Sequence, residues 1–351
     1  MPLELPPVDI THMFREAASA SAAVRAQLRD EASAAAIGKE LRRLAPRAVI
    51  TCARGSSDHA ATYAKYLIET RMGVLTASAA PSVSSVYGVA QDLRGCLFLA
   101  ISQSGRSPDL LASVAAAKAA GATVLALCNN PDAPLMGAAD LSMNLDAGLE
   151  TSVAATKSYL ASLAALLRLV AAWRGDAELA RSTAALPDLM DRTWTLDWSP
   201  AVPVLAHAAH LYVVGRGLGL GAAQETALKC KETCGLHAEA FSSAELRHGP
   251  FTLLDVDFPA LLYAQSDATR PGVEALAAEL ARRNVPILVA GADAAEARAA
   301  GAIVLPTLRA PAEIGPILLV QSAYRLIATL ALARGFDPDR PAHLRKVTET
   351  V

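Results

Sequence analysis

Short apolar runs alternate with longer amphipathic stretches along most of the chain. Runs that favour buried strands occur at residues 48–52, 74–77, 96–101 and 124–127, and again at 211–214, 260–264, 287–290 and 303–305. Helical patterns separate most of them. Strands that alternate with helices are typical of a mainly parallel sheet covered on both faces, because parallel strands need long crossover connections. The pattern therefore predicts an α/β fold with one such sheet in each half of the chain.

Changes in this pattern divide the chain into segments. Residues 11–44 have a helical pattern, and a buried crossover helix is predicted at 158–173, interrupted by Arg168. Charges, prolines and tryptophans gather at 173–200, which indicates a linking helix followed by a loop, and a long helix is expected at 317–334. With about 100–200 residues per domain, we expect a helical segment at 1–45, domains at 46–175 and 199–334, a linker at 176–198 and a tail at 335–351.

The two halves share a short signature. Arg54-Gly55 is followed after four residues by Ala60-Ala61, and Arg216-Gly217 is followed at the same spacing by Ala222-Ala223. Each copy follows an apolar strand and opens a helix. The repetition predicts that the two domains are copies of one α/β unit.

Composition narrows the class of protein. Of 351 residues, 53% are hydrophobic, and Lys+Arg 32 against Asp+Glu 34 give a net charge of −2. This balance argues against a nucleic-acid surface or a membrane-docking face, so an anionic ligand would need a local site. The five cysteines are scattered without a CxxC pair, as in a reduced cytoplasmic protein. No signal peptide, uninterrupted apolar span of about 18 residues, metal motif or cofactor motif is visible, so we expect none of these.

A serine-rich loop follows the strand at 96–101. It reads Ser102-Gln103-Ser104-Gly105-Arg106-Ser107-Pro108-Asp109 and leads into a helix. In an open parallel sheet, ligands bind beyond the carboxyl ends of the strands, where a helix beginning near Pro108 would direct its free backbone N–H groups. Hydroxyl groups and a glycine suit a phosphate cradle, although a serine-rich turn without a ligand would have the same sequence. Gly55-Ser56-Ser57 has the same character, and the loop at 148–157 is a candidate third wall.

A stretch in the second half carries acid–base groups. Residues 225–250 read ETALKCKETCGLHAEAFSSAELRHGP, and on a helix Glu225, Lys229 and Glu232 would share one stripe. Gly235 predicts the end of that helix. Residues 242–245, SSAE, predict a capping box for a second short helix that ends at His248. Carboxylates, an amine and an imidazole are the groups that proton transfer needs. A surface helix with ordinary ion pairs is the other interpretation.

Together these segments resemble a known family. SQSGRSPDLLASVAAAKAAGATVLALCN, ETSVAATKS, the stretch at 225–250 and the tail RPAHLRKVT are similar, in order and spacing, to the isomerase half of glucosamine-6-phosphate synthase. That half is a tandem pair of sugar-isomerase (SIS) domains. The resemblance implies two tandem SIS domains, each a mainly parallel five-stranded, flavodoxin-like sheet flanked by helices. Pro2 stands where the cysteine nucleophile of the family's glutaminase would follow Met1, so no glutaminase is expected.

Residue by residue, the resemblance implies a sugar-phosphate site. The residues that would hold the phosphate and the sugar hydroxyls are Ser56, Ser57, Ser102, Gln103, Ser104 and Ser107, with Val153 contacting the sugar through its backbone. Glu232 would move a proton between C1 and C2, and Lys229 would lie beside C2 and the amino group. His248, supplied by the neighbouring subunit, would open the sugar ring, and Lys346 would contact the open-chain carbonyl. Ala155 departs from the family, which has a serine there.

The expected activity follows from this resemblance. Without an internal ammonia source, breakdown is the preferred direction, and TCARGSSDHAATYAKYLIE looks like the stand-alone SIS-type glucosamine-6-phosphate deaminases. We therefore expect a cytoplasmic homodimer with a shared active site that converts glucosamine 6-phosphate to fructose 6-phosphate and ammonia. The alternatives are a galactosamine-6-phosphate deaminase/isomerase, a fructosamine-phosphate deglycase, an ammonia-dependent synthase, or a non-catalytic sugar-phosphate sensor. The retained Lys229, Glu232, His248 and Lys346 argue against the sensor.

Overall fold

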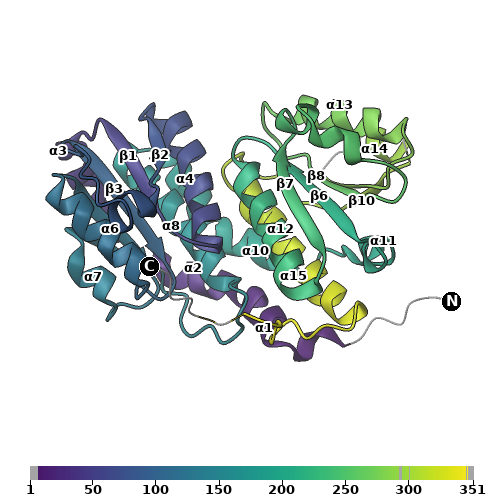
Figure 1. Cartoon of the computed structure of the whole chain (residues 1–351), viewed down its shortest axis with the longest axis horizontal. Helices are drawn as coiled ribbons and strands as arrows, with labels where there is room; N and C mark the ends of the chain where they lie inside the picture. Colours follow the sequence, from purple (N-terminus) through teal and green to yellow (C-terminus); the bar gives the residue numbers. More distant parts are fainter. Residues whose placement is uncertain (1–6, 292–294, 300, 345, 347–351) are drawn as a thin grey trace. The chain divides into compact units, whose positions relative to one another are not determined.

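The computed structural model of the chain describes residues 7–291, 295–299, 301–344 and 346. Its helices and strands form two compact units (Figure 1). The first unit contains residues 20–150 and 157–187 together with Lys346, and the second contains residues 7–19, 151–156 and 188–344. Each unit has a five-stranded sheet, and every described strand pair is parallel. The predicted α/β class is confirmed.

The first unit is built on one doubly wound sheet. Its strands are β1 (Ala48–Cys52), β2 (Thr76–Ser78), β3 (Cys96–Ser102), β4 (Thr123–Cys128) and β5 (Leu141–Asn144), in the order β2-β1-β3-β4-β5. Its helices are α2 (Ala20–Leu28), α3 (Glu31–Leu44), α4 (Ser56–Met72), α5 (Pro81–Ser85), α6 (Pro108–Ala119), α7 (Pro134–Ala138), α8 (Lys157–Arg174) and α9 (Ala177–Ala184). The strand order reverses between β1 and β3, so a ligand crevice is expected at their carboxyl ends.

Helix α8 is the predicted crossover helix and is buried along almost its whole length, where it packs against α3 and α4. The guanidinium in its middle is hydrogen-bonded, because Arg168 Nη2 donates to the Asp30 carbonyl oxygen at 2.6 Å, and the negative charges of Asp30, Asp146 and Glu31 lie near it. Strand β3 is buried at every position. The first-unit core therefore lies on both faces of the sheet, as expected for a parallel sheet.

The second unit repeats this architecture. Its strands are β6 (His210–Gly215), β7 (His237–Ser242), β8 (Ala260–Tyr263), β9 (Ile287–Ala290) and β10 (Ile303–Leu305). Its helices are α1 (His12–Ala18), α10 (Leu186–Trp194), α11 (Val202–Ala206), α12 (Gly219–Cys234), α13 (Arg270–Ala281), α14 (Ala295–Ala299) and α15 (Gly315–Ala333), with short 3-10 turns η1 (Val8–Ile10), η2 (Ser199–Ala201), η3 (Glu245–Arg247) and η4 (Pro250–Leu253). The order β7-β6-β8-β9-β10 matches that of the first sheet, and this agreement supports the predicted duplication.

Some elements differ from the sequence pattern. The apolar pattern does not locate β5 or the edge strand β7, since β7 carries His237 and Glu239 and has few buried positions. The single linking helix expected at 173–200 is two helices, α9 and α10. The N-terminal helical residues divide between the units, and α1 packs against α15 in the second.

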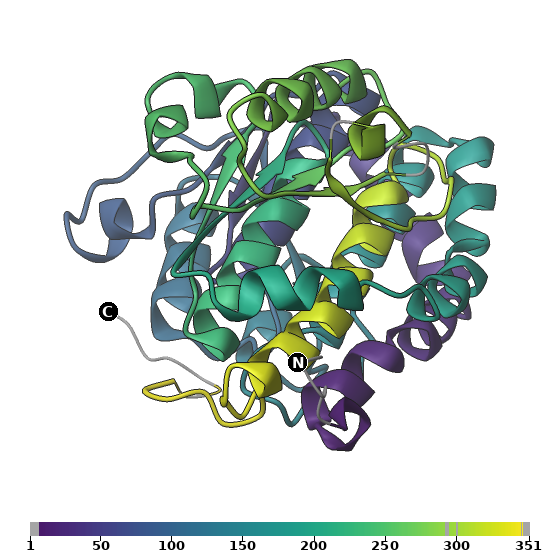
Figure 2. The same cartoon turned by 90° about the vertical axis from the view of Figure 1, so that its right-hand side faces the viewer.

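Helix α15 is the long apolar helix of the second unit and is yellow in Figures 1 and 2. It is long and apolar enough, by composition alone, to cross a membrane, yet 78% of its most apolar window is buried inside the protein. Its side chains pack against α12. Burial of this kind is typical of a core helix.

The cysteines behave as small apolar residues. All five lie within the described residues, and they are free and buried. Burial raises the pKa of Cys52 to about 11, so its thiol stays neutral at physiological pH. Among the described residues, no group of three or more His, Cys, Asp or Glu side chains is arranged to hold a metal ion.

Gly235 ends α12 in the left-handed conformation, with φ of 56°. A Cβ there would approach the ring of Phe336 to 2.6 Å. We expect Gly235→Ala to lower the free energy of unfolding by about 1–2 kcal/mol, because a side chain disfavours this conformation. Urea denaturation measures the change. The control is Gly272→Ala in α13, where the nearest atom to an added Cβ is 3.8 Å away and alanine should stabilise the helix. Equal effects of the two substitutions would contradict this account.

Candidate active site

Helix α12 brings three charged side chains together in the second unit. Glu225, Lys229 and Glu232 lie four and three residues apart, so they share one face of the helix, as predicted. Lys229 Nζ lies 2.6 Å from Glu232 Oε2 and 3.3 Å from Glu225 Oε1. The side chains of Lys229 and Glu225 are 1% and 0% exposed, whereas that of Glu232 is 20% exposed. The alternative of a solvated surface helix is wrong, and of the three groups Glu232 is the one that solvent or a ligand can reach.

The electrostatics of this cluster favour a charged lysine. Burial lowers the pKa of Lys229, but the negative charges of Glu225 and Glu232 outweigh burial, and the net effect raises it. Tyr324 of α15 donates a hydrogen bond from its hydroxyl to Glu225 Oε1 at 2.9 Å. Sequence reasoning missed Tyr324, since it lies 99 residues from Glu225 and no local motif marks it. The cluster presents a carboxylate base beside an ammonium that can stabilise negative charge.

The turn after β7 carries His248. Ser242 Oγ accepts a hydrogen bond from the Glu245 backbone N–H at 3.1 Å, which is half of the predicted capping box. The expected second helix is a single 3-10 turn, η3, and His248 follows it as an exposed residue. Within the described residues, no hydrogen bond or ion pair joins the His248 ring to α12. In the part of the chain that the structure describes, this imidazole is thus not bonded to the Lys229 cluster.

Two serine-containing loops meet at the switch point of the first sheet. Ser56 and Ser57 open α4 after β1, and Ser102, Gln103, Ser104 and Ser107 follow β3. Because β1 and β3 are parallel neighbours, both loops leave the same edge of the sheet. Arg54 Nε also donates to Asp109 Oδ2 at 2.9 Å and so joins the two loops. The structure therefore brings the predicted phosphate-binding residues of these loops together.

The geometry of the loop after β3 suits an anion. Ser102 Oγ accepts a hydrogen bond from the Gly105 backbone N–H at 3.0 Å, which tightens the turn. Gly105 has φ of 64°, and a Cβ there would lie 2.7 Å from Cys128 Sγ, so this position needs glycine. Ser107 is the N-cap residue of α6 and, among described residues, accepts no capping hydrogen bond. The N-termini of α4 and α6 thus open beside hydroxyl groups, an arrangement that favours a phosphate.

The loop that carries Val153 belongs to the second unit. Residues 151–156 group with α1, whose Glu16 carboxylate accepts hydrogen bonds from the backbone N–H groups of Thr151 and Ser152. Glu16 is buried. The loop that is predicted to touch the sugar through Val153 is therefore fixed by a carboxylate that no sequence motif indicates.

Lys346 lies with the first unit. Its Nζ is 3.1 Å from Glu150 Oε2, and its side chain is 26% exposed. The tail lysine thus has a defined partner in the loop after β5.

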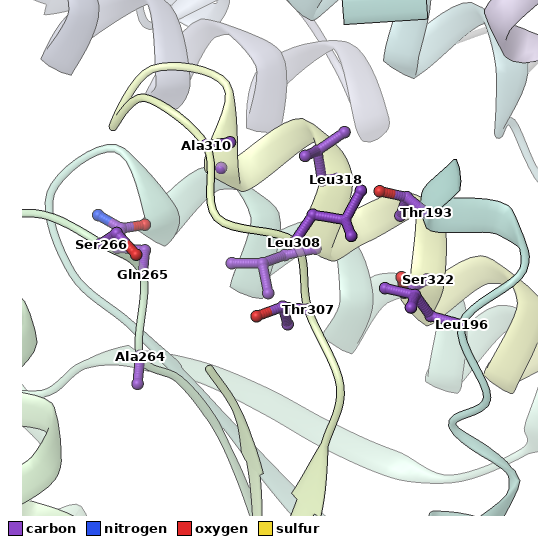
Figure 3. A pocket seen from close by; sticks show the side chains of 12 residues that line it. Thr193, Leu196, Ala264, Gln265, Ser266, Thr307, Leu308, Ala310, Leu318 and Ser322 are labelled. Carbon is purple, nitrogen blue, oxygen red and sulfur yellow. The ribbon is translucent and has the colours of Figure 1, made fainter. Parts of the chain in front are cut away.

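The switch point of the second sheet is filled by its own side chains. Asp267, on the loop after β8, accepts hydrogen bonds from the Thr269 backbone N–H at 2.7 Å, the Thr269 hydroxyl and the Gln265 amide. The adjoining cavity, shown in Figure 3 between this loop and α15, holds about 20 Å³. That is room for about one water molecule and far less than a hexose phosphate needs. A negative carboxylate there would also repel phosphate.

The chain contains two doubly wound parallel domains in tandem. One has hydroxyl groups beside its helix N-termini, and the other has a helix with a buried lysine–carboxylate cluster. These features define a class of duplicated α/β proteins with divergent halves. The SIS domain family model matches residues 45–172 and 204–334, and the chain belongs to that family. The predicted tandem pair of SIS domains is confirmed.

Similar proteins support this assignment. The glutamine–fructose-6-phosphate aminotransferase [isomerizing] of Legionella pneumophila (strain Lens) is 33% identical over 310 residues, which cover 85% of this chain and 50% of that protein. The chain thus spans about half the length of the curated relatives it matches. A candidate phosphosugar isomerase from Silicibacter pomeroyi DSS-3 is 37% identical with a TM-score of 0.89, covering 94% of this chain and 100% of that one. The C-terminal domain of glucosamine-fructose-6-phosphate aminotransferase from Francisella tularensis is 26% identical with a TM-score of 0.84, covering 95% and 98%.

The α12 cluster makes a prediction for stability. We expect Lys229→Met to lower the free energy of unfolding by about 3–5 kcal/mol, because it leaves the buried Glu225 without its charge partner. The matched control is Lys231→Met, the same substitution at an exposed position of the same helix, which should change stability by less than about 0.5 kcal/mol. Chemical denaturation of both variants measures the difference. Similar losses in the two would mean that the buried pair does not support α12.

Proposed function

We propose that this chain is an enzyme that isomerises and deaminates a hexosamine 6-phosphate, with glucosamine 6-phosphate as the first candidate. One observation carries the proposal: a buried ammonium lies 2.6 Å from a partly exposed carboxylate on one helix of a SIS domain. Such a pair suits proton transfer next to a carbon that develops negative charge. Similarity to an aminotransferase described as isomerizing supports sugar-phosphate chemistry.

In this proposal the first unit holds the phosphate. Ser56, Ser57, Ser102, Gln103, Ser104 and Ser107 surround the phosphate and the adjacent sugar hydroxyls, aided by the N-termini of α4 and α6. Glu232 meets the other end of the same substrate at C1 and C2, and the Lys229 ammonium lies directly behind it, 2.6 Å from its carboxylate. Val153 adds a backbone contact to the sugar, and Lys346 contacts the open-chain carbonyl.

The proposed mechanism has three steps. His248 assists ring opening, which gives the C1 aldehyde and the C2 amine. Glu232 removes the proton from C2, O1 takes up a proton from water to give an enolamine, and Glu232 delivers its proton to C1, which leaves an iminium ion at C2. Water adds to C2 and loses a proton to give a carbinolamine, which expels ammonia and leaves fructose 6-phosphate. Lys229 stabilises the negative charge that develops as C2 loses its proton.

His248 gives this proposal a quaternary component. The residue is exposed after η3, and no described contact joins its ring to α12 in the same chain. The family resemblance implies that the neighbouring subunit supplies it. We therefore propose a homodimer in which each site receives His248 from the partner copy.

The choice of deamination rests on the similarity of residues 51–69 to stand-alone deaminases. Galactosamine 6-phosphate, a fructosamine phosphate, or synthesis from fructose 6-phosphate and ammonia would use the same cluster. Discrimination between glucosamine 6-phosphate and galactosamine 6-phosphate depends on a single hydroxyl contact. A non-catalytic sensor would only bind the sugar phosphate and would not need a base beside a buried ammonium.

The direct test is to incubate the protein with glucosamine 6-phosphate and to measure ammonium and fructose 6-phosphate together. We expect equal amounts of both, and a rate about 10²–10⁴-fold lower in Glu232→Gln, the usual scale for a positioned base. Glu178→Gln, which alters an exposed carboxylate on α9, is the control and should keep the wild-type rate.

Three results would count against the proposal. Isomerisation without ammonium release would reject the deaminase, and an undiminished rate in Glu232→Gln would reject the role of that residue. A substrate preference for galactosamine 6-phosphate, with tagatose 6-phosphate as product, would replace the first candidate substrate and keep the mechanism.

A further inference from the structure

Glu150 is a buried carboxylate that the proposed mechanism leaves without a role. It lies in the loop after β5, three residues before Val153, and its side chain is 0% exposed. Its oxygens accept hydrogen bonds from the Ser158 backbone N–H at 3.1 Å, the Ser158 hydroxyl at 2.6 Å and Lys346 Nζ at 3.1 Å. All of these groups belong to the first unit.

The surroundings of Glu150 suit a charged carboxylate. A buried carboxylate is costly unless hydrogen bonds and an opposite charge compensate for lost hydration. Ser158 supplies two donors in the first turn of α8, where the helix dipole also favours negative charge. Lys346 supplies an opposite charge, with its Nζ 3.1 Å from Glu150 Oε2.

The pairing with Glu150 also restricts the conformations of the Lys346 side chain. Lys346 follows a long irregular tail, and a lysine side chain on such a segment would otherwise sample many conformations. Glu150 is anchored by α8, a buried helix, so the ammonium is tied to the rigid part of the first unit. Because 26% of the Lys346 side chain stays exposed, the bond does not seal the lysine off from a ligand.

We infer that Glu150 is a positioning residue for Lys346. It holds the Lys346 ammonium where that ammonium can contact the carbonyl of an open-chain sugar phosphate. The role of Lys346 toward the substrate rests on the proposed function. The Glu150–Lys346 pair itself does not, so it can be tested separately. Prior placement of a donor removes an ordering step from the reaction, and a misplaced donor can reduce the rate greatly.

The first experiment is a double-mutant cycle on stability, with Glu150→Gln, Lys346→Met and both together in the full chain. Lys346→Met alone removes a positive charge from beside a buried carboxylate, so the urea midpoint should fall. Adding Glu150→Gln should raise the midpoint again, because an amide can still accept from Ser158 and carries no charge. Additive losses would overturn the inferred pairing.

The second experiment measures kcat/KM. With glucosamine 6-phosphate, we expect Glu150→Gln to lower kcat/KM by about tenfold or more, Glu150→Asp to recover part of the loss, and Glu150→Gln to add little in the Lys346→Met background. Ser162→Ala, which removes a buried hydroxyl one turn further along α8 and leaves the contacts of Glu150 in place, is the matched control. It should lower stability while kcat/KM stays within about twofold of the wild type.

The two readouts separate the two ideas. If the stability losses of the Glu150 and Lys346 variants are not additive but the protein shows no activity on hexosamine phosphates, the Glu150–Lys346 pair is supported and the proposed function is rejected. An active enzyme in which Glu150→Gln and Ser162→Ala lose the same rate would show Glu150 to be a purely structural anchor of α8 and would overturn its positioning role.

Discussion

A lysine ammonium buried between two carboxylates is the interaction on which the site depends. Lys229 can remain charged inside the protein because Glu225 and Glu232 flank it on the same helix face, and Tyr324 supports Glu225 from α15. The arrangement fixes the position of Glu232 while leaving part of it exposed. It requires α12 to stay a regular helix up to Gly235 and to pack on α15, so the chemistry and the core of the second unit depend on the same contacts.

Duplication followed by divergence explains how the two halves differ. Both sheets have the same strand order and the same switch point. In the first unit that point is bordered by serine loops and the N-termini of two long helices. In the second, Asp267 and Gln265 fill the equivalent loop and leave a cavity of about 20 Å³. Among the described residues, the serine-lined switch point of the first unit thus has no counterpart in the second, where the helix beside the switch point carries the lysine–carboxylate cluster instead.

The sequence predicts features that depend on local spacing. The stripe on α12, the end of that helix at Gly235 and most strands follow from periodicity and glycine conformation. Tyr324, Glu16 and Glu150 were not predicted as site residues, because their partners lie 99, 135 and 196 residues away and no local pattern encodes such pairs. Strand β7 was missed because an edge strand with charged residues lacks an apolar run.

The proposed function requires one hexosamine phosphate to be held at its phosphate end by the serine loops and to meet Glu232 of α12 at C1 and C2. The most direct measurement is a crystal structure with a hexitol 6-phosphate, an open-chain sugar phosphate that cannot react. The account predicts phosphate oxygens within hydrogen-bonding distance of Ser102, Ser104 or Ser107, and a Glu232 carboxylate oxygen close to C1 and C2. A ligand bound away from α12, or phosphate held by the loop of Asp267, would contradict it.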